Sequence, residues 1–128
     1  MRATQSLPAA AAALLLAAAP AAAEEQFRID TAGDLARLCA TKPAANAYVA
    51  AVHMCQGFIL GAHHFHEAME TGLGGQGEGI YCVPADGAPS RDEVMADFSA
   101  WVNSTPGMPG QEAIEALMQY AATRFPCE

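Results

Sequence analysis

The residues best suited to chemistry are histidines and an acid in one short segment, His63-His64-Phe65-His66-Glu67. An imidazole and a carboxylate four residues apart on a helix can share a transition-metal ion, and His63 and Glu67 have this spacing. Successive helical residues point about 100° apart, so His64 and His66 diverge from His63. We therefore predict a solvated histidine-rich face, with His66 turned toward the core and no metal site or cofactor. His63 and Glu67 come nearest to a ligand pair.

Cysteines are the second chemical feature, at Cys39, Cys55, Cys82 and Cys127. No two of them form a C-x-x-C pair, and an even number of cysteines in an exported chain is normally oxidised. The sequence therefore predicts two disulfides rather than a nucleophilic or redox-active thiol.

Other catalytic patterns have little support. The serines that follow residue 23 are Ser90, Ser99 and Ser104, and none lies in a G-x-S-x-G context. The glycine-rich segment 72–79 lacks the G-K-[ST] that a phosphate-binding loop requires. The sequence therefore favours a protein that is not an enzyme.

Helical periodicity predicts an all-α fold, a small four-helix domain with two disulfides, to position these side chains. The expected helices cover residues 31–39, 45–71, 90–102 and 109–125. Two of them begin with a capping box, in which a Thr or Ser is followed three residues later by an acid: Thr31 with Asp34, and Ser90 with Glu93. Five glycines within residues 72–79 predict a mobile surface loop after the long helix.

The apolar side chains of the long helix predict one wide core face. Its expected members are Tyr48, Val52, Cys55, Ile59, Ala62 and Met69, with Met54, Phe58 and Phe65 beside them. The last helix is expected to turn inward Ile114, Leu117, Met118, Ala121 and Phe125. Gly57 and Gly61 form a G-x-x-x-G pattern, which predicts close packing of a neighbouring segment.

The first 23 residues are typical of a secretory leader. Arg2 supplies a positive start, residues 9–19 an apolar core, and Ala21-Ala22-Ala23 a small-residue cleavage site. Cleavage would leave one domain of about 105 residues, 24–128, in the periplasm. A membrane anchor is disfavoured, because the apolar run is shorter than the roughly 20 residues that a span needs.

The chain is strongly acidic, with 14 Asp and Glu against 6 Lys and Arg and a net charge of −8. Loss of the leader would remove Arg2 and no acid, which makes the charge −9. Nucleic-acid and anionic-membrane binding are therefore disfavoured, since both require basic patches. A basic protein partner fits the charge better.

An up-down path of the helices favours one disulfide pairing, Cys39 with Cys55 and Cys82 with Cys127. The path brings the end of the first helix to the start of the second, and the start of the third to the end of an antiparallel fourth. Four cysteines allow three connectivities, and the sequence alone leaves the choice open.

The cysteines and their neighbours resemble the Rap1a/Tai family of type VI secretion immunity proteins. The matching motifs are Thr31-Ala-Gly-Asp-Leu-Ala-Arg-Leu-Cys39, Cys55-Gln-Gly-Phe-Ile-Leu-Gly61, Tyr81-Cys82-Val-Pro84 and Arg124-Phe-Pro-Cys127. The resemblance implies a small periplasmic helical protein that binds and blocks a secreted toxin, such as an amidase that cuts peptidoglycan peptides. It also implies that a homodimer is one expected assembly.

Inhibition would require a contact surface, which we expect around the glycine-rich segment. We predict that it includes Glu70, Glu78, Tyr81 and Asp86, because an acidic surface attracts a basic toxin. Three other functions stay open: a periplasmic chaperone of the acid-stress type, a histidine-based metal binder, and a structural protein with no toxin partner.

Overall fold

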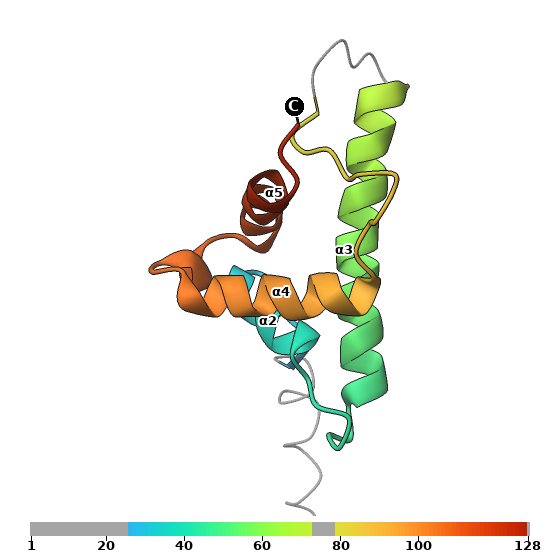
Figure 1. Cartoon of the computed structure of the whole chain (residues 1–128). Coiled ribbons are helices and arrows are strands. Elements are labelled where there is room, and N and C mark those ends of the chain that lie inside the picture. Colours follow the sequence, from blue (N-terminus) through green and yellow to red (C-terminus); the bar gives the residue numbers. More distant parts are fainter. Residues whose placement is uncertain (1–25, 73–78, 128) are drawn as a thin grey trace, which may run out of the picture.

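The computed structural model describes residues 26–72 and 79–127, and over these ranges the protein is helical, without strands. Its elements are α2 (Ala32–Cys39), α3 (Tyr48–Thr71), α4 (Arg91–Ser104), a 3-10 turn η1 (Met108–Gly110) and α5 (Ala113–Arg124) (Figure 1). The predicted all-α fold of four helices is confirmed. The predicted leader and residues 73–78 of the predicted glycine-rich loop lie outside the described residues.

The two predicted capping boxes are present at the starts of α2 and α4. Thr31 Oγ1 accepts the N–H of Asp34 at 3.2 Å, and the Asp34 carboxylate accepts the N–H of Thr31 at 3.1 Å. Ser90 and Glu93 form the same reciprocal pair, at 3.3 and 2.7 Å. Each box pairs backbone N–H groups that have no partner inside the helix, which fixes where the helix begins.

Two other helices begin later than predicted. α3 begins at Tyr48 rather than Ala45, and α5 begins at Ala113 rather than near Pro109, which lies in η1. Neither start has a side-chain cap, so the sequence carries no local signal that marks it.

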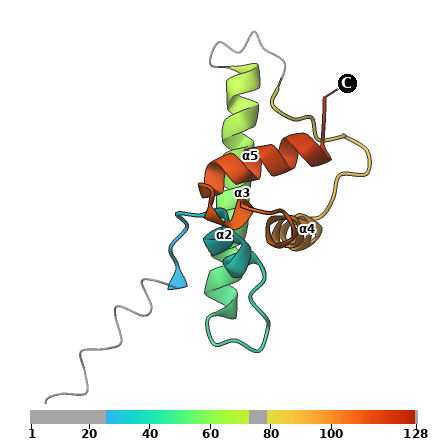
Figure 2. The ribbon, with the colours of Figure 1, turned by 90° about the vertical axis from the view of Figure 1, so that its left-hand side faces the viewer.

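α2 lies at the centre of the fold and contacts α3, α4, α5 and η1 (Figure 2). Half of its side chains are no more than 1% exposed: Ala32, Leu35, Ala36 and Leu38. Gly33 lets η1 approach α2 closely, because a Cβ at that position would lie 3.0 Å from the carbonyl oxygen of Pro109. The shortest α-helix therefore organises the core.

The backbone before α2 runs beside the start of α5, although the two are far apart in the sequence. The N–H of Ala32 donates to the carbonyl of Gln111 at 2.8 Å, and the N–H of Ala113 donates to the carbonyl of Asp30 at 3.2 Å. Both donors stand at the first residue of a helix, where the N–H lacks an intrahelical partner. Each helix start thus receives its missing hydrogen-bond acceptor from the backbone just before the other helix.

Both disulfides have the favoured pairing, Cys39–Cys55 and Cys82–Cys127. The helices do not follow the up-down path from which this pairing was inferred. α4 lies across α3, and α5 runs in a third direction (Figures 1 and 2). The pairing instead follows from the central place of α2, whose last residue meets α3, and from the segment after α3 returning to the end of α5.

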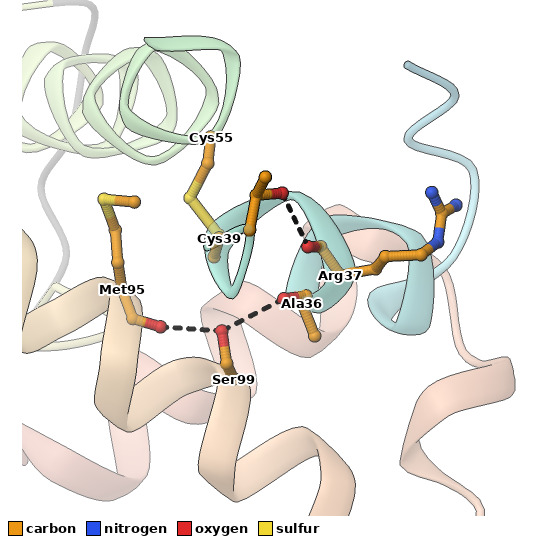
Figure 3. Close-up of a disulfide and its surroundings, with 7 residues drawn as sticks. Ala36, Arg37, Cys39, Cys55, Met95 and Ser99 are labelled. Carbon is orange, nitrogen blue, oxygen red and sulfur yellow. Dashed lines mark hydrogen bonds between the residues drawn. A yellow bond between two sulfur atoms is a disulfide. The ribbon is translucent and has the colours of Figure 1, made fainter. Parts of the chain in front are cut away.

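The first disulfide packs against α4, as Figure 3 shows. Ser99 is buried there, and its hydroxyl donates to the carbonyl of Met95 at 2.8 Å and lies 3.2 Å from the carbonyl oxygen of Ala36 on α2. Because a buried polar group without a partner is costly, these contacts allow α4 to pack directly on α2.

The core face of α3 is narrower than predicted. Ala51, Cys55 and His66 are its buried residues. Three side chains expected in or beside the core are exposed: Phe65 (66%), Met69 (43%) and Met54 (37%). Ile114 of α5, also expected inside, is 44% exposed. The apolar residues of α3 do form one arc of the helix, but the other helices cover only part of that arc.

Candidate partner-binding surface

His66 joins the end of α3 to the chain that returns after it. The side chain is buried, and its Nε2 accepts the N–H of Ile80 at 3.0 Å. Its ring stacks on the ring of Tyr81, with centroids 4.1 Å apart and planes 14° apart. His66 therefore turns inward, as predicted, and holds residues 80 and 81 against α3.

Tyr81, expected on a contact surface, is 5% exposed. Its hydroxyl lies 2.9 Å from Nδ1 of His63. Burial raises the pKa of this hydroxyl above its ordinary value of 10.0, and the carboxylates of Glu67 and Glu70 raise it further. Tyr81 is thus neutral at physiological pH, and its ring fixes the backbone beneath the surface.

The other residues expected on this surface are acids. Glu70 is half-buried, with its Oε1 3.5 Å from Nε2 of His66, and Asp86 is exposed in the segment before α4. Glu78 lies outside the described residues. Glu67, which was considered only as a metal ligand, is exposed one turn before Glu70. The end of α3 therefore presents two carboxylates close together.

His63 and Glu67, which come nearest to a ligand pair in the sequence although no metal site is predicted, have Nε2 and Oε1 3.6 Å apart. His64 Nδ1 lies 3.2 Å from the other oxygen of Glu67. Protein metal sites of this class usually need three or four protein ligands. Across residues 26–72 and 79–127, no group of three or more His, Cys, Asp or Glu side chains is placed to hold an ion.

A polar link between α4 and α5 was not predicted. The carboxylate of Asp97 pairs with the guanidinium of Arg124, whose Nε and Nη2 each lie 2.9 Å from one of its oxygens. The same carboxylate accepts a hydrogen bond of 2.9 Å from the hydroxyl of Tyr120. Burial raises the pKa of Tyr120, and the hydrogen bond to Asp97 raises it further. Residues on different helices have no fixed spacing in the sequence, so no local pattern could have found this link.

An apolar pocket of about 160 Å³ lies between α3, α4, α5 and the segment that follows Tyr81. Its walls include Ile59 of α3, Val94 of α4, and Leu117 and Ala121 of α5. No local sequence pattern marks this pocket, because a pocket depends on how helices cross rather than on the face of any one helix.

Part of α3 is uncovered: in Figure 1, α2 and α5 lie to one side of it and α4 crosses it. The predicted neighbour of the G-x-x-x-G pattern is absent from the described chain: a Cβ on Gly57 or Gly61 would meet nothing within 4 Å. Residues 48–66 contain no Asp, Glu, Lys or Arg, although Val49 and Phe65 are well exposed. Exposed apolar surface without charge is typical of an interface.

The length of α3 does not make it a membrane span. It has 24 residues. Within the part of the chain that the structure describes, no helix combines the length and hydropathy needed to cross a bilayer.

The chain is similar to a known protein family. A family model described as Rap1a immunity proteins matches residues 31–127. The matched range contains the four α-helices found in residues 26–72 and 79–127, and both disulfides. No curated protein and no solved structure matches the chain.

Proposed function

Because the chain belongs to the Rap1a immunity protein family, we propose that it protects its cell by binding and blocking a toxin of a type VI secretion system. The observation that carries the proposal is the family match over residues 31–127. Immunity proteins of this family are periplasmic, and the two disulfides fit an exported protein. The proposed action is tight binding, without catalysis by the immunity protein itself.

The proposed target is an amidase that cuts peptidoglycan peptides, which acts in the periplasm. Export would use the leader, with cleavage after Ala23 leaving residues 24–128 as one domain. Intact-mass measurement of protein from a periplasmic extract tests this route. A chain that begins at Glu24 is expected, and a full-length chain retained in the cytoplasm would contradict it.

We place the toxin contact at the end of α3 and along the segment before α4. Glu67, Glu70 and Asp86 are found there, in a chain with a net charge of −8. Such a surface attracts a basic partner over about a Debye length and speeds its association. Glu78 remains part of this proposed surface, while Tyr81 supports it from below.

The test is co-expression with a periplasm-directed hydrolase encoded beside this protein's gene. Restored growth, and a complex that survives size-exclusion chromatography, are expected. Absence of both with every adjacent hydrolase would contradict the proposal.

Charge reversal locates the contact. The double variant Glu67→Lys/Glu70→Lys should weaken toxin binding by about tenfold or more, mainly through slower association. Glu112→Lys/Glu115→Lys is the matched control, because it makes the same charge change at the exposed start of α5. Equal weakening by both pairs would point to net charge rather than to this surface.

A second copy of the chain is the proposed cover for the uncharged face of α3. Exposed small residues there are Ala50, Gly57, Gly61 and Ala68, which are spaced symmetrically about residue 59. In a two-fold interface, each contact between two positions occurs twice, so two antiparallel α3 helices would pair Gly57 with Gly61 and Ala50 with Ala68. The lack of charge over residues 48–66 lets two acidic chains meet here without repulsion.

The dimer is tested by light scattering coupled to size-exclusion chromatography. The wild type should have twice the monomer mass, and Gly61→Leu should dissociate it by separating the helices. Ile114→Asp, which places a charge on an exposed apolar residue of α5, should remain dimeric. A wild type that is monomeric at all concentrations would contradict this assembly.

A further inference from the structure

The apolar pocket between α3, α4 and α5 has the size of one aromatic ring. Its volume is about 160 Å³, close to that of an engineered apolar cavity of about 150 Å³ that stays dry and binds benzene. We propose that this pocket receives a single aromatic side chain from a basic segment of a protein partner. The identification of that partner with the toxin rests on the proposed function above.

The walls of the pocket lie on helices that are each fixed to a neighbouring helix by an ion pair or a disulfide. Leu117 and Ala121 lie on α5, which the Asp97–Arg124 pair ties to α4, and Val94 lies on α4 itself. Ile59 lies on α3, one turn after the disulfide-bonded Cys55. A preformed apolar pocket needs little ordering when it is filled, so most of the free energy of burying a ring contributes to affinity.

A cationic side chain at the border of the pocket also favours an aromatic ring as its occupant. Arg91, the first residue of α4, lines it and makes no ion pair with an acid of the described residues. The guanidinium groups of Arg37 and Arg124, in contrast, are paired with Asp34 and Asp97. A free guanidinium can lie over the face of an aromatic ring and be attracted by its quadrupole.

The charges nearby favour a basic segment around that ring. Asp92 and Glu93 follow Arg91 directly, and Asp86 lies between the lining residues Val83 and Pro89. An anionic ligand would be repelled by these acids, whereas Lys or Arg residues beside the aromatic anchor would be attracted. Aromatic side chains in enclosed pockets are also the residues that most often dominate the affinity of an interface.

Benzene tests the capacity of the pocket without the partner. Methyl resonances of Ile59, Val94 and Leu117 should shift saturably when benzene is added to the disulfide-bonded protein. Ala121→Leu should abolish the shifts, because the larger side chain fills the pocket, and Leu117→Phe is a second filling variant. Ala122→Leu makes the same change at the next residue of α5, which does not line the pocket, and should keep them. Unshifted methyl resonances in the wild type at benzene saturation would overturn the proposal.

Toxin binding tests the occupant. Ala121→Leu should lower toxin affinity at least tenfold while its melting temperature stays at or above that of the wild type, since filling a cavity stabilises. Ala122→Leu should bind as the wild type does. If the toxin binds the wild type and Ala121→Leu equally, the pocket proposal fails and the immunity function stands. If no toxin binds the wild type, the immunity function fails, and the benzene titration alone decides whether the pocket accepts a ring.

Discussion

The amide of Ile80 donates a hydrogen bond of 3.0 Å to Nε2 of His66, which precedes it by 14 residues. An imidazole nitrogen accepts a hydrogen bond only when it is unprotonated, so this contact belongs to neutral His66. The carboxylate of Glu70 lies 3.5 Å from the same nitrogen. One histidine thus sets the position of the backbone beside the proposed toxin contact.

Replacing His66 with Leu should weaken the packing of residues 80 and 81 against α3. The variant keeps an apolar side chain but loses the acceptor and the stacking on Tyr81, which should lower the free energy of unfolding by about 1–3 kcal/mol. Denaturant unfolding measures the loss, and hydrogen exchange should show faster exchange at Ile80. His64→Leu, at an exposed position of the same helix, should stay within about 0.5 kcal/mol of the wild type.

Alkaline pH should destabilise the protein through Tyr81 and Tyr120. Burial and nearby carboxylates raise both pKa values above 10.0 in the folded state. The folded chain therefore holds these protons more tightly than the unfolded chain does, and the stability this gives is complete below pH 10. It is lost as pH rises through the raised pKa values.

Urea unfolding at pH 8, 10 and 11 measures this loss. Lys42 is the only lysine, so few other groups titrate in this range. Tyr120→Phe should make the unfolding free energy fall less steeply with pH, because the variant lacks one of the two hydroxyls. An unfolding free energy that does not fall between pH 10 and 11 would show that the two hydroxyls titrate as they do in the unfolded chain.

The two disulfides should contribute unequally. They close loops of 16 and 45 residues, for which loop-closure entropy gives about 3 and about 4 kcal/mol. Replacing both cysteines of each pair with Ala, followed by denaturant unfolding, measures the two contributions. The Cys39–Cys55 pair should lose more than its entropic share, because Cys55 is fully buried and its sulfur packs in the core. A negligible loss for either pair would argue against the bond in solution.

Alanine at two glycines should have opposite effects on stability. Gly33→Ala places a Cβ 3.0 Å from a backbone oxygen of Pro109 and should destabilise by about 1–2 kcal/mol. Gly57→Ala meets nothing within 4 Å in the described chain and should stabilise α3 by about 0.5–1 kcal/mol in dilute solution. Thermal unfolding of the pair checks both. A stabilising Gly33→Ala would mean that η1 moves away from α2.

Local signals allowed most of the fold to be predicted from the sequence. The capping boxes at Thr31 and Ser90 gave two helix starts, because the hydrogen bonds that define them join residues three apart. The start of α5 was misplaced, since Pro109 and Gly110 form a separate turn without a capping side chain. Features set within one turn of helix were therefore predictable.

Contacts between different helices could not be predicted from the sequence. The exposed Phe65 and the enclosed Tyr81 reverse what was expected of each, because exposure depends on which arc of α3 the other helices cover. The Asp97–Arg124 pair and the apolar pocket also arise where helices cross. His66 was the exception, since its direction on α3 alone pointed it toward the core.

The central position of α2 has a consequence for how the chain folds. The short helix buries its side chains mainly against α4, η1 and α5, which follow it by more than 50 residues. A large loop must therefore close before α2 gains its stabilising contacts, and closure opposes folding entropically. We expect α2 to form late, and a fragment that ends before α5 to expose apolar surface and aggregate rather than fold into a partial domain.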